Sequence, residues 1–333
     1  SLGLPLLYQD TGDGLDDSVG KRLEDGLLAA CREIGTALLD EGRVREGWMY
    51  LRPVGDKAGV SARVRGLAVT DANADELIEV TFYEAVDVEY GFGLMLARHG
   101  TCNSITAMES AGQQLSKVDR QKAVALLVRH VHQELLANVA ADIAAREGTA
   151  PAATTLRDLC APREWLFGEH SYHLDTTHLA ATVRFAETLT DPVTLQLAWD
   201  LTEYGRRLNA QFQFPGEEPF AEMYPAHALF FGASLGEQVD EAVSYFRRKA
   251  ETIDAYQVGA MSIEIYVELL ARLRRYEEAI EAALRLMPDN VHPVGFAPSL
   301  LELARNAGCY DRVLEYCRKR NDLLGFATAL AHA

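Results

Sequence analysis

The sequence predicts an all-α protein built as an array of helical hairpins, and three observations indicate this class. Apolar residues recur at helical spacing in nearly every long segment. Two hairpins follow one another between Ala260 and Arg320. The segment that begins at Arg274 returns thirty-four residues later at Gly308, in the same kind of turn. Hairpins repeated at such a distance bury their apolar faces only against their neighbours, so we expect one curved α-α superhelix.

Small and aromatic residues at matching positions make these hairpins resemble the tetratricopeptide-repeat (TPR) family. Tyr276 and Ala279 stand where that family places an aromatic residue and a small residue of close packing. Tyr310 and Val313 occupy these places in the next copy, and Ala242 marks an upstream copy. The resemblance implies a TPR-like α-solenoid that recognises a peptide or a protein on its concave face. It leaves the activity open, since repeat folds carry many unrelated functions.

The copies depart from the family pattern, so the resemblance holds at the level of packing geometry. Arg274 replaces the glycine of its turn, while Gly308 keeps it. Clear matches cover residues 220–320, and a weaker copy with Gly42 in its turn covers residues 20–54. We expect Ala242, Ala279 and Val313 to be buried where paired helices meet.

Composition indicates three parts of the chain. Residues 1–19 read as a flexible acidic leader, and residues 20–148 as an irregular helical region with one degenerate repeat. The small-residue stretch 149–154 is a candidate linker. Residues 155–333 then carry the TPR-like helical repeats.

The helices expected in the N-terminal part are separated by glycine and proline. In order they cover residues 21–39, 44–51, 75–96, 103–109 and 120–146. Gly42 and Pro53 end the first two, and Asn73 or Asp75 would cap the third. Residues 53–74 are expected to be a connecting loop, although the alternation of Val60, Ala62 and Val64 would also suit a short extended segment. The glycines at 91 and 93 are expected to bend or break the third helix.

In the C-terminal part, helices are expected at residues 176–189 and 192–208, before the clear hairpins. Asp175 is a natural N-cap of the first, with Leu174 and Leu179 placed to form a hydrophobic staple. Asp191 followed by Pro192 is a strong start for the second.

Net charge and cysteine spacing exclude several classes of function. The chain carries 49 acidic and 32 basic residues, a formal charge of −17, which disfavours a nucleic-acid partner. No run approaches the roughly 20 apolar residues of a membrane-spanning helix. The five cysteines are scattered without a Cys-x-x-Cys pair, which argues against a disulfide framework and favours a reducing cytoplasm.

One histidine cluster suggests chemistry. His170, His173 and His178 lie within ten residues that also hold Glu169 and Asp175. Imidazole and carboxylate groups together suit a divalent transition metal such as zinc, manganese or iron. The alternative is that Asp175 only caps its helix and the histidines lie on the surface. No nucleophile, phosphate-binding or dinucleotide motif accompanies the cluster, and no other cofactor is expected.

The leading hypothesis is therefore a helical-repeat scaffold that binds a peptide or protein partner. Glu264, Glu268 and Arg272, on the first helix of a hairpin, are expected to line the concave surface. Because the chain is acidic, the preferred partner would carry basic residues. The alternative is a metal-dependent enzyme that uses the His/Asp cluster at residues 169–178.

Overall fold

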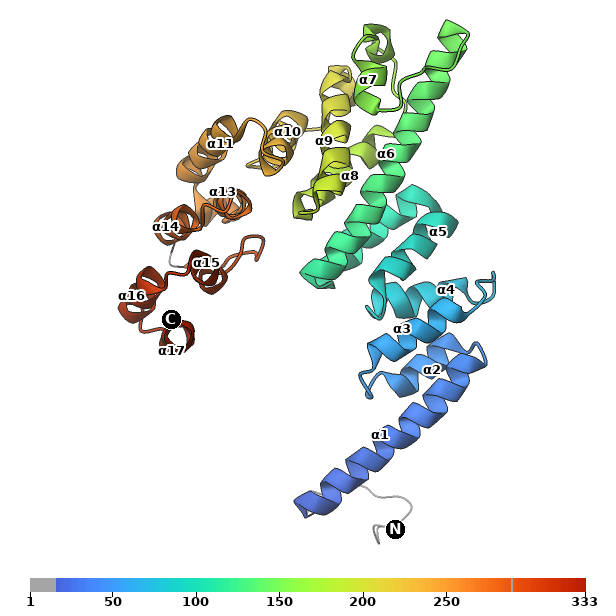
Figure 1. Cartoon of the computed structure of the whole chain (residues 1–333), viewed down its shortest axis with the longest axis vertical. Coiled ribbons are helices and arrows are strands. Elements are labelled where there is room, and N and C mark those ends of the chain that lie inside the picture. The colour runs from blue at the N-terminus through green and yellow to red at the C-terminus, as the bar shows by residue number, and fades with distance from the viewer. Residues whose placement is uncertain (1–15, 289) are drawn as a thin grey trace. The chain divides into compact units, whose positions relative to one another are not determined.

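Helices form all the regular structure of residues 16–288 and 290–333, the part of the chain that this computed structural model describes (Figure 1). No strand occurs in these two ranges, so the predicted all-α class is confirmed. The acidic leader predicted for residues 1–19 lies outside the described residues up to residue 15, and helix α1 already begins at Asp17. Within the described ranges, no helix combines the length and apolar character that a membrane span needs.

The described residues form two compact units, one up to residue 126 and the other from residue 127 onward. Their division falls inside a long helix, α6 (Lys117–Glu147), upstream of the linker predicted at residues 149–154. The other elements of the first unit are, in order, α1 (Asp17–Asp40), α2 (Val44–Leu51), α3 (Lys57–Gly66), α4 (Ala74–Ile78), the π-helical turn η1 (Glu79–Tyr83), α5 (Val88–Ala111) and the 3-10 turn η2 (Gly112–Gln114).

The hairpin α1–α2 depends on two glycines that let its helices approach closely. A Cβ on Gly35 would lie 2.9 Å from the carbonyl oxygen of Gly47, and one on Gly47 would lie 3.0 Å from the carbonyl oxygen of Gly35. Gly42 has a φ of 80° in the intervening turn, which favours glycine. The predicted boundaries of this hairpin are thus correct to within a few residues.

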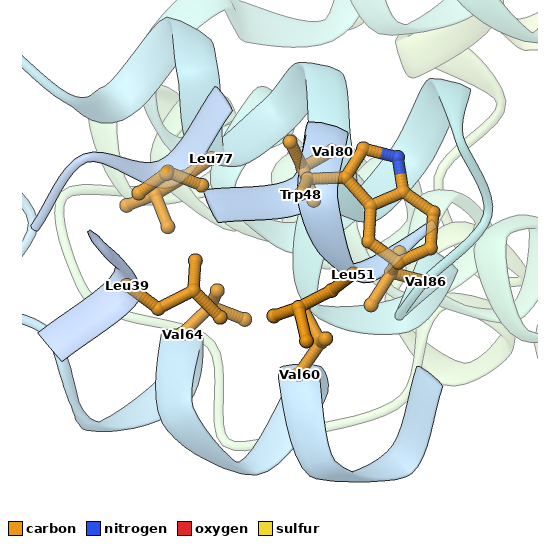
Figure 2. Packing of buried hydrophobic residues seen from close by; sticks show 9 residues of the cluster. Leu39, Trp48, Leu51, Val60, Val64, Leu77, Val80 and Val86 are labelled. Carbon is orange, nitrogen blue, oxygen red and sulfur yellow. The ribbon is translucent and has the colours of Figure 1, made fainter. Parts of the chain in front are cut away.

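An apolar core joins the first four helices of this unit (Figure 2). Figure 2 shows side chains from these helices, from η1 and from the segment after η1 meeting in one cluster, namely Leu39, Trp48, Leu51, Val60, Val64, Leu77, Val80 and Val86. Val60 and Val64 come from α3, which lies in the predicted loop of residues 53–74. That prediction was wrong because the same two valines, four residues apart, also share one face of a helix. Asp56 caps this helix by accepting the N–H of Gly59.

The helix predicted over residues 75–96 is interrupted, but upstream of its glycines. The break lies between η1 and α5, where Ala85 has a φ of 52° and Asp87 caps the next helix through the N–H of Tyr90. Gly91 does not interrupt the helix but allows close packing. A Cβ there would lie 2.7 Å from the backbone nitrogen of Phe82, so the glycine permits α5 to pack against η1.

The second unit continues as short helices that pack largely on their neighbours in sequence. After the rest of α6 its elements are, in order, α7 (Leu156–Cys160), η3 (Glu164–Phe167), α8 (Thr176–Phe185), η4 (Ala186–Thr188), α9 (Pro192–Arg207), η5 (Ala210–Phe212), α10 (Met223–Ser234), α11 (Val239–Thr252), α12 (Ala255–Val258), α13 (Met261–Arg272), α14 (Tyr276–Leu286), α15 (Leu300–Ala307), α16 (Asp311–Lys319) and α17 (Leu323–His332). Helix α13 contacts α11 and α14, and α14 contacts α15. Asp191 and Pro192 begin α9 as predicted.

The three small residues expected at helix contacts are all buried. Ala242 and Ala279 are 0% exposed, and Val313 is 1% exposed. The two turns that the sequence aligns also share one backbone conformation, because Arg274 has a φ of 58° and Gly308 a φ of 65°. An arginine therefore occupies a left-handed position that suits glycine.

This strain predicts opposite effects for two reciprocal substitutions. Arg274→Gly should raise the free energy of unfolding by about 0.5–1 kcal/mol, because glycine adopts a positive φ without the Cβ clash. Gly308→Arg should lower it by about 1 kcal/mol through strain alone, since no atom lies within 4 Å of a Cβ built there. Urea unfolding of the two variants measures both changes. If both substitutions raised or both lowered the free energy of unfolding, backbone strain at residue 274 would be contradicted.

Candidate functional site

The first candidate site surrounds the histidine cluster at the start of α8. Asp175 accepts hydrogen bonds from the backbone N–H groups of Thr177 (2.8 Å) and His178 (3.3 Å), so the predicted N-cap is confirmed. Leu174 and Leu179, expected to form a staple, are both buried. The cap fixes the start of α8 and the path of the segment before it.

His173 is held by residues distant in sequence. Its backbone N–H donates to the hydroxyl of Tyr204 (3.0 Å), which also lies 2.9 Å from Nδ1 of the same histidine. Its Nε2 lies 3.2 Å from Oδ2 of Asp142 on α6. These groups are all satisfied when the Tyr204 O–H donates to Nδ1 and the Nε2–H donates to the carboxylate. Burial raises the pKa of Tyr204, so its hydroxyl keeps its proton at neutral pH.

The three histidines have different surroundings. His170 and His173 border an open, polar hollow of about 600 Å³ with Glu134, Asp142 and Arg146. His170 is exposed, while His178 is half-buried in the first turn of α8 and does not border the hollow. Within residues 16–288 and 290–333, no group of three or more His, Cys, Asp or Glu side chains is placed to hold a metal ion. The metal prediction for His170, His173 and His178 thus rests on the sequence pattern alone.

The second candidate site concerns the residues predicted to line a binding surface on α13. Glu264 and Glu268 are only 2% and 4% exposed, and the Arg272 side chain is 8% exposed. The prediction that these three residues line an exposed surface is wrong, because α10, α11 and α14 pack against α13 and bury them. Each of these charges has a partner inside the protein.

Arg272 joins three parts of the second unit. Its Nε donates to Glu268 (2.8 Å), its Nη2 donates to the backbone carbonyl of Glu187 (2.6 Å), and its guanidinium lies 4.6 Å from the ring centre of Phe230. The Glu187 carboxylate in turn lies 2.8 Å from Nε2 of His227, a histidine that is 1% exposed. This network links α13 to η4 and α10, so Glu268 and Arg272 act in the interior.

Glu264 holds the segment that leads into α15. Its carboxylate accepts hydrogen bonds from the backbone N–H groups of Val294 (2.5 Å), Phe296 (2.7 Å) and Ala297 (3.3 Å). Three donors on one carboxylate compensate for its removal from water. The segment, which contains Pro293, Gly295 and Pro298, therefore lies against α13 with its backbone toward the acid.

A hollow of about 600 Å³ lies beside Glu264, between two successive hairpins. Its walls come from α13, α14, α15 and the segment between the last two, and its rim includes the end of α16 and residues after it. Apolar side chains cover much of it, namely Val267, Ala283, Met287, Val291 and Leu300. Glu302 and Asp322 add carboxylates, and Arg320 adds a guanidinium that donates to the hydroxyl of Tyr316 (3.0 Å). The volume is within the usual range of about 300–1,000 Å³ for small-ligand sites.

No protein-family model, curated protein or solved structure matches this chain.

The cap at Asp175 predicts a pH-dependent stability difference. The side-chain hydrogen bond from Thr177, aided by backbone N–H donors, lowers the pKa of Asp175 below 3.8. A lowered folded-state pKa stabilises the fold above the unfolded-state pKa, and this stabilisation is lost as the pH falls through the folded-state pKa. Asp175→Ala should therefore cost about 1 kcal/mol at pH 7 and less near pH 3. Urea unfolding at both values measures the difference.

Asp175→Asn is the matched control, because its side-chain oxygen can still cap the helix. At pH 7 its stability should fall between those of the parent and Asp175→Ala, because it keeps the capping oxygen and lacks the charge. A cost for Asp175→Ala that is the same at pH 3 and pH 7 would contradict a role for the carboxylate charge.

Proposed function

We propose that the second unit is a TPR-like helical-repeat scaffold that binds a peptide or protein segment in the hollow beside Glu264. The observation that carries this proposal is the position of the hollow, between the hairpins α13–α14 and α15–α16, with apolar walls and a charged rim. Repeat folds bind partners on the surfaces that successive hairpins create together. The sequence period and the burial of Ala279 and Val313 support the same repeat arrangement.

The chemistry of the lining suggests which partner fits. Val267, Ala283 and Leu300 offer apolar contacts for one or two side chains of an extended peptide. Glu302 and Asp322 at the rim favour a basic residue beside them. Glu264 contributes by holding residues 294–297 in place as one wall, and its carboxylate is already used by that backbone. The partner is thus a peptide with apolar anchors next to a Lys or Arg.

A peptide-display experiment tests this function. The full chain is immobilised and panned against a random library of about twelve-residue peptides, and selected sequences are measured in solution by fluorescence anisotropy. We expect enrichment of apolar residues flanked by Lys or Arg, with Kd values of about 10–100 μM, typical of a shallow site. The affinity should fall as salt rises from 50 to 500 mM, because the rim attraction is screened.

Two substitutions with the same charge change locate the binding. Ala283→Arg places a long cationic side chain in the hollow and should weaken binding at least tenfold. Ala327→Arg on α17 adds the same charge at an exposed position that does not border the hollow, and should change binding less than twofold. Circular dichroism confirms that both variants are folded. Absence of selected peptides, or equal effects of the two variants, would overturn the proposal.

A further inference from the structure

A smaller pocket lies between α7 and α9 in the second unit, and it shares only Tyr204 with the sites described above. It has a volume of about 240 Å³, and its side chains include Leu156, Arg157, Cys160, Asp200, Glu203, Tyr204 and Arg207. Asp200, Glu203, Tyr204 and Arg207 share one face of α9, because they lie three, four and seven residues after the first of them. Leu156, Cys160 and Tyr204 are buried and form an apolar base.

Asp200 is enclosed but poorly satisfied. Its side chain is 13% exposed, and Nε2 of Gln196 donates to Oδ1 at 3.1 Å. The cationic or titratable neighbours stand farther away, with His132 Nε2 3.6 Å from Oδ2 and Arg157 Nη2 3.8 Å from Oδ1. Both distances exceed a normal hydrogen bond. Oδ2 thus carries charge but has no donor within hydrogen-bond distance among the described residues.

His132 does not border the pocket, but it shows that the surroundings of Asp200 are also incompletely paired on the side of α6. The residue is only 9% exposed, and its Nε2 makes no hydrogen bond to any described residue. Leaving a buried polar atom unpaired costs about 1–3 kcal/mol, so such atoms often mark a place where a ligand or water completes the structure. Here the unpaired nitrogen faces the same carboxylate oxygen that lacks a donor.

The other charged side chains of the pocket differ in whether they already form hydrogen bonds or ion pairs within the chain. Arg207 donates to the carbonyl of Cys160 (2.9 Å) and to Glu164 (2.7 Å), and Glu203 pairs with Arg206 (2.9 Å). Among the residues that the structure describes, Arg157 has only its stacking on Trp199, at 4.9 Å, and the long contact with Asp200. One anionic and one cationic group, Asp200 and Arg157, therefore remain for a ligand.

We propose that this pocket binds a small zwitterion of the free α-amino acid class. An ammonium group would donate to the carboxylate of Asp200, and a carboxylate would accept from the guanidinium of Arg157. The volume holds roughly eight groups of the size of water, at about 30 Å³ each, which is the size of a small amino acid. A simple cation fits less well, because Arg157 and Arg207 both border the pocket.

The reactive side chain at the base does not take part. Burial raises the pKa of the Cys160 thiol to about 11, so the thiol is not a nucleophile at neutral pH. The site is accordingly one of binding, and the proposal does not depend on peptide binding at the Glu264 hollow.

Isothermal titration of the full chain with each of the twenty free amino acids tests this inference. At least one small amino acid should bind with a Kd below 5 mM. The matching amine without its carboxylate, and the matching carboxylic acid without its amine, should each bind at least tenfold more weakly. No binding by any amino acid at 5 mM, or undiminished binding of the amine alone, would overturn the proposal.

Variants of the pocket give the second half of the test. Asp200→Asn and Arg157→Gln should each weaken binding at least tenfold, because each removes one of the two recognising charges. Glu203→Gln is the matched control, since this acid borders the pocket but is paired with Arg206, and its effect should stay below twofold. Circular dichroism establishes that each variant is folded. Equal affinities of Asp200→Asn and Glu203→Gln would contradict the assignment.

Discussion

The second unit depends on a guanidinium that is removed from water and shared among several helices. Arg272 meets the carboxylate of Glu268, the carbonyl of Glu187 and the face of Phe230, while Glu187 also meets His227. A buried charge is tolerated only where such partners replace its water, and removing one partner of a buried pair typically costs about 3–5 kcal/mol. This requirement fixes the arrangement of η4, α10 and α13, and so it fixes the wall from which Glu264 reaches the segment before α15.

Both proposed sites contain some charged side chains that are paired within the chain, beside groups that remain accessible to a ligand. At the Glu264 hollow, the acid holds a backbone segment, and the apolar lining beside it remains accessible. In the pocket between α7 and α9, Arg207 and Glu203 are paired within the chain. Among the described residues, Asp200 accepts one hydrogen bond, from Gln196, and Arg157 approaches Asp200 only to 3.8 Å. In this second pocket, the difference between charges that are paired within the chain and charges that are not separates structural residues from candidate binding residues.

The histidine cluster illustrates why closeness in sequence does not establish a site. His170, His173 and His178 lie within nine residues, but α8 begins between the second and the third. His173 is oriented by Tyr204 and Asp142, each 31 residues away in the sequence. No motif marks these two partners, because their spacing to His173 depends on how α6 and α9 are packed. The sequence analysis did not identify Asp200 and His132 for the same reason, because they come from different helices that are brought together only by packing.

The sequence by itself determined the features that neighbouring residues control. The caps at Asp175 and Asp191, the turn at Gly42 and the boundaries of α2 follow from hydrogen bonds and backbone preferences within a few positions. The burial of Ala242, Ala279 and Val313 followed from the repeated hairpin pattern. Only the tertiary structure decided that residues 57–66 form a helix and that Glu264, Glu268 and Arg272 face inward. The valines of α3 fit a strand or a helix equally well until a core is available on one side. A charged side chain likewise lies at the surface or in the interior according to the partners that distant segments bring to it.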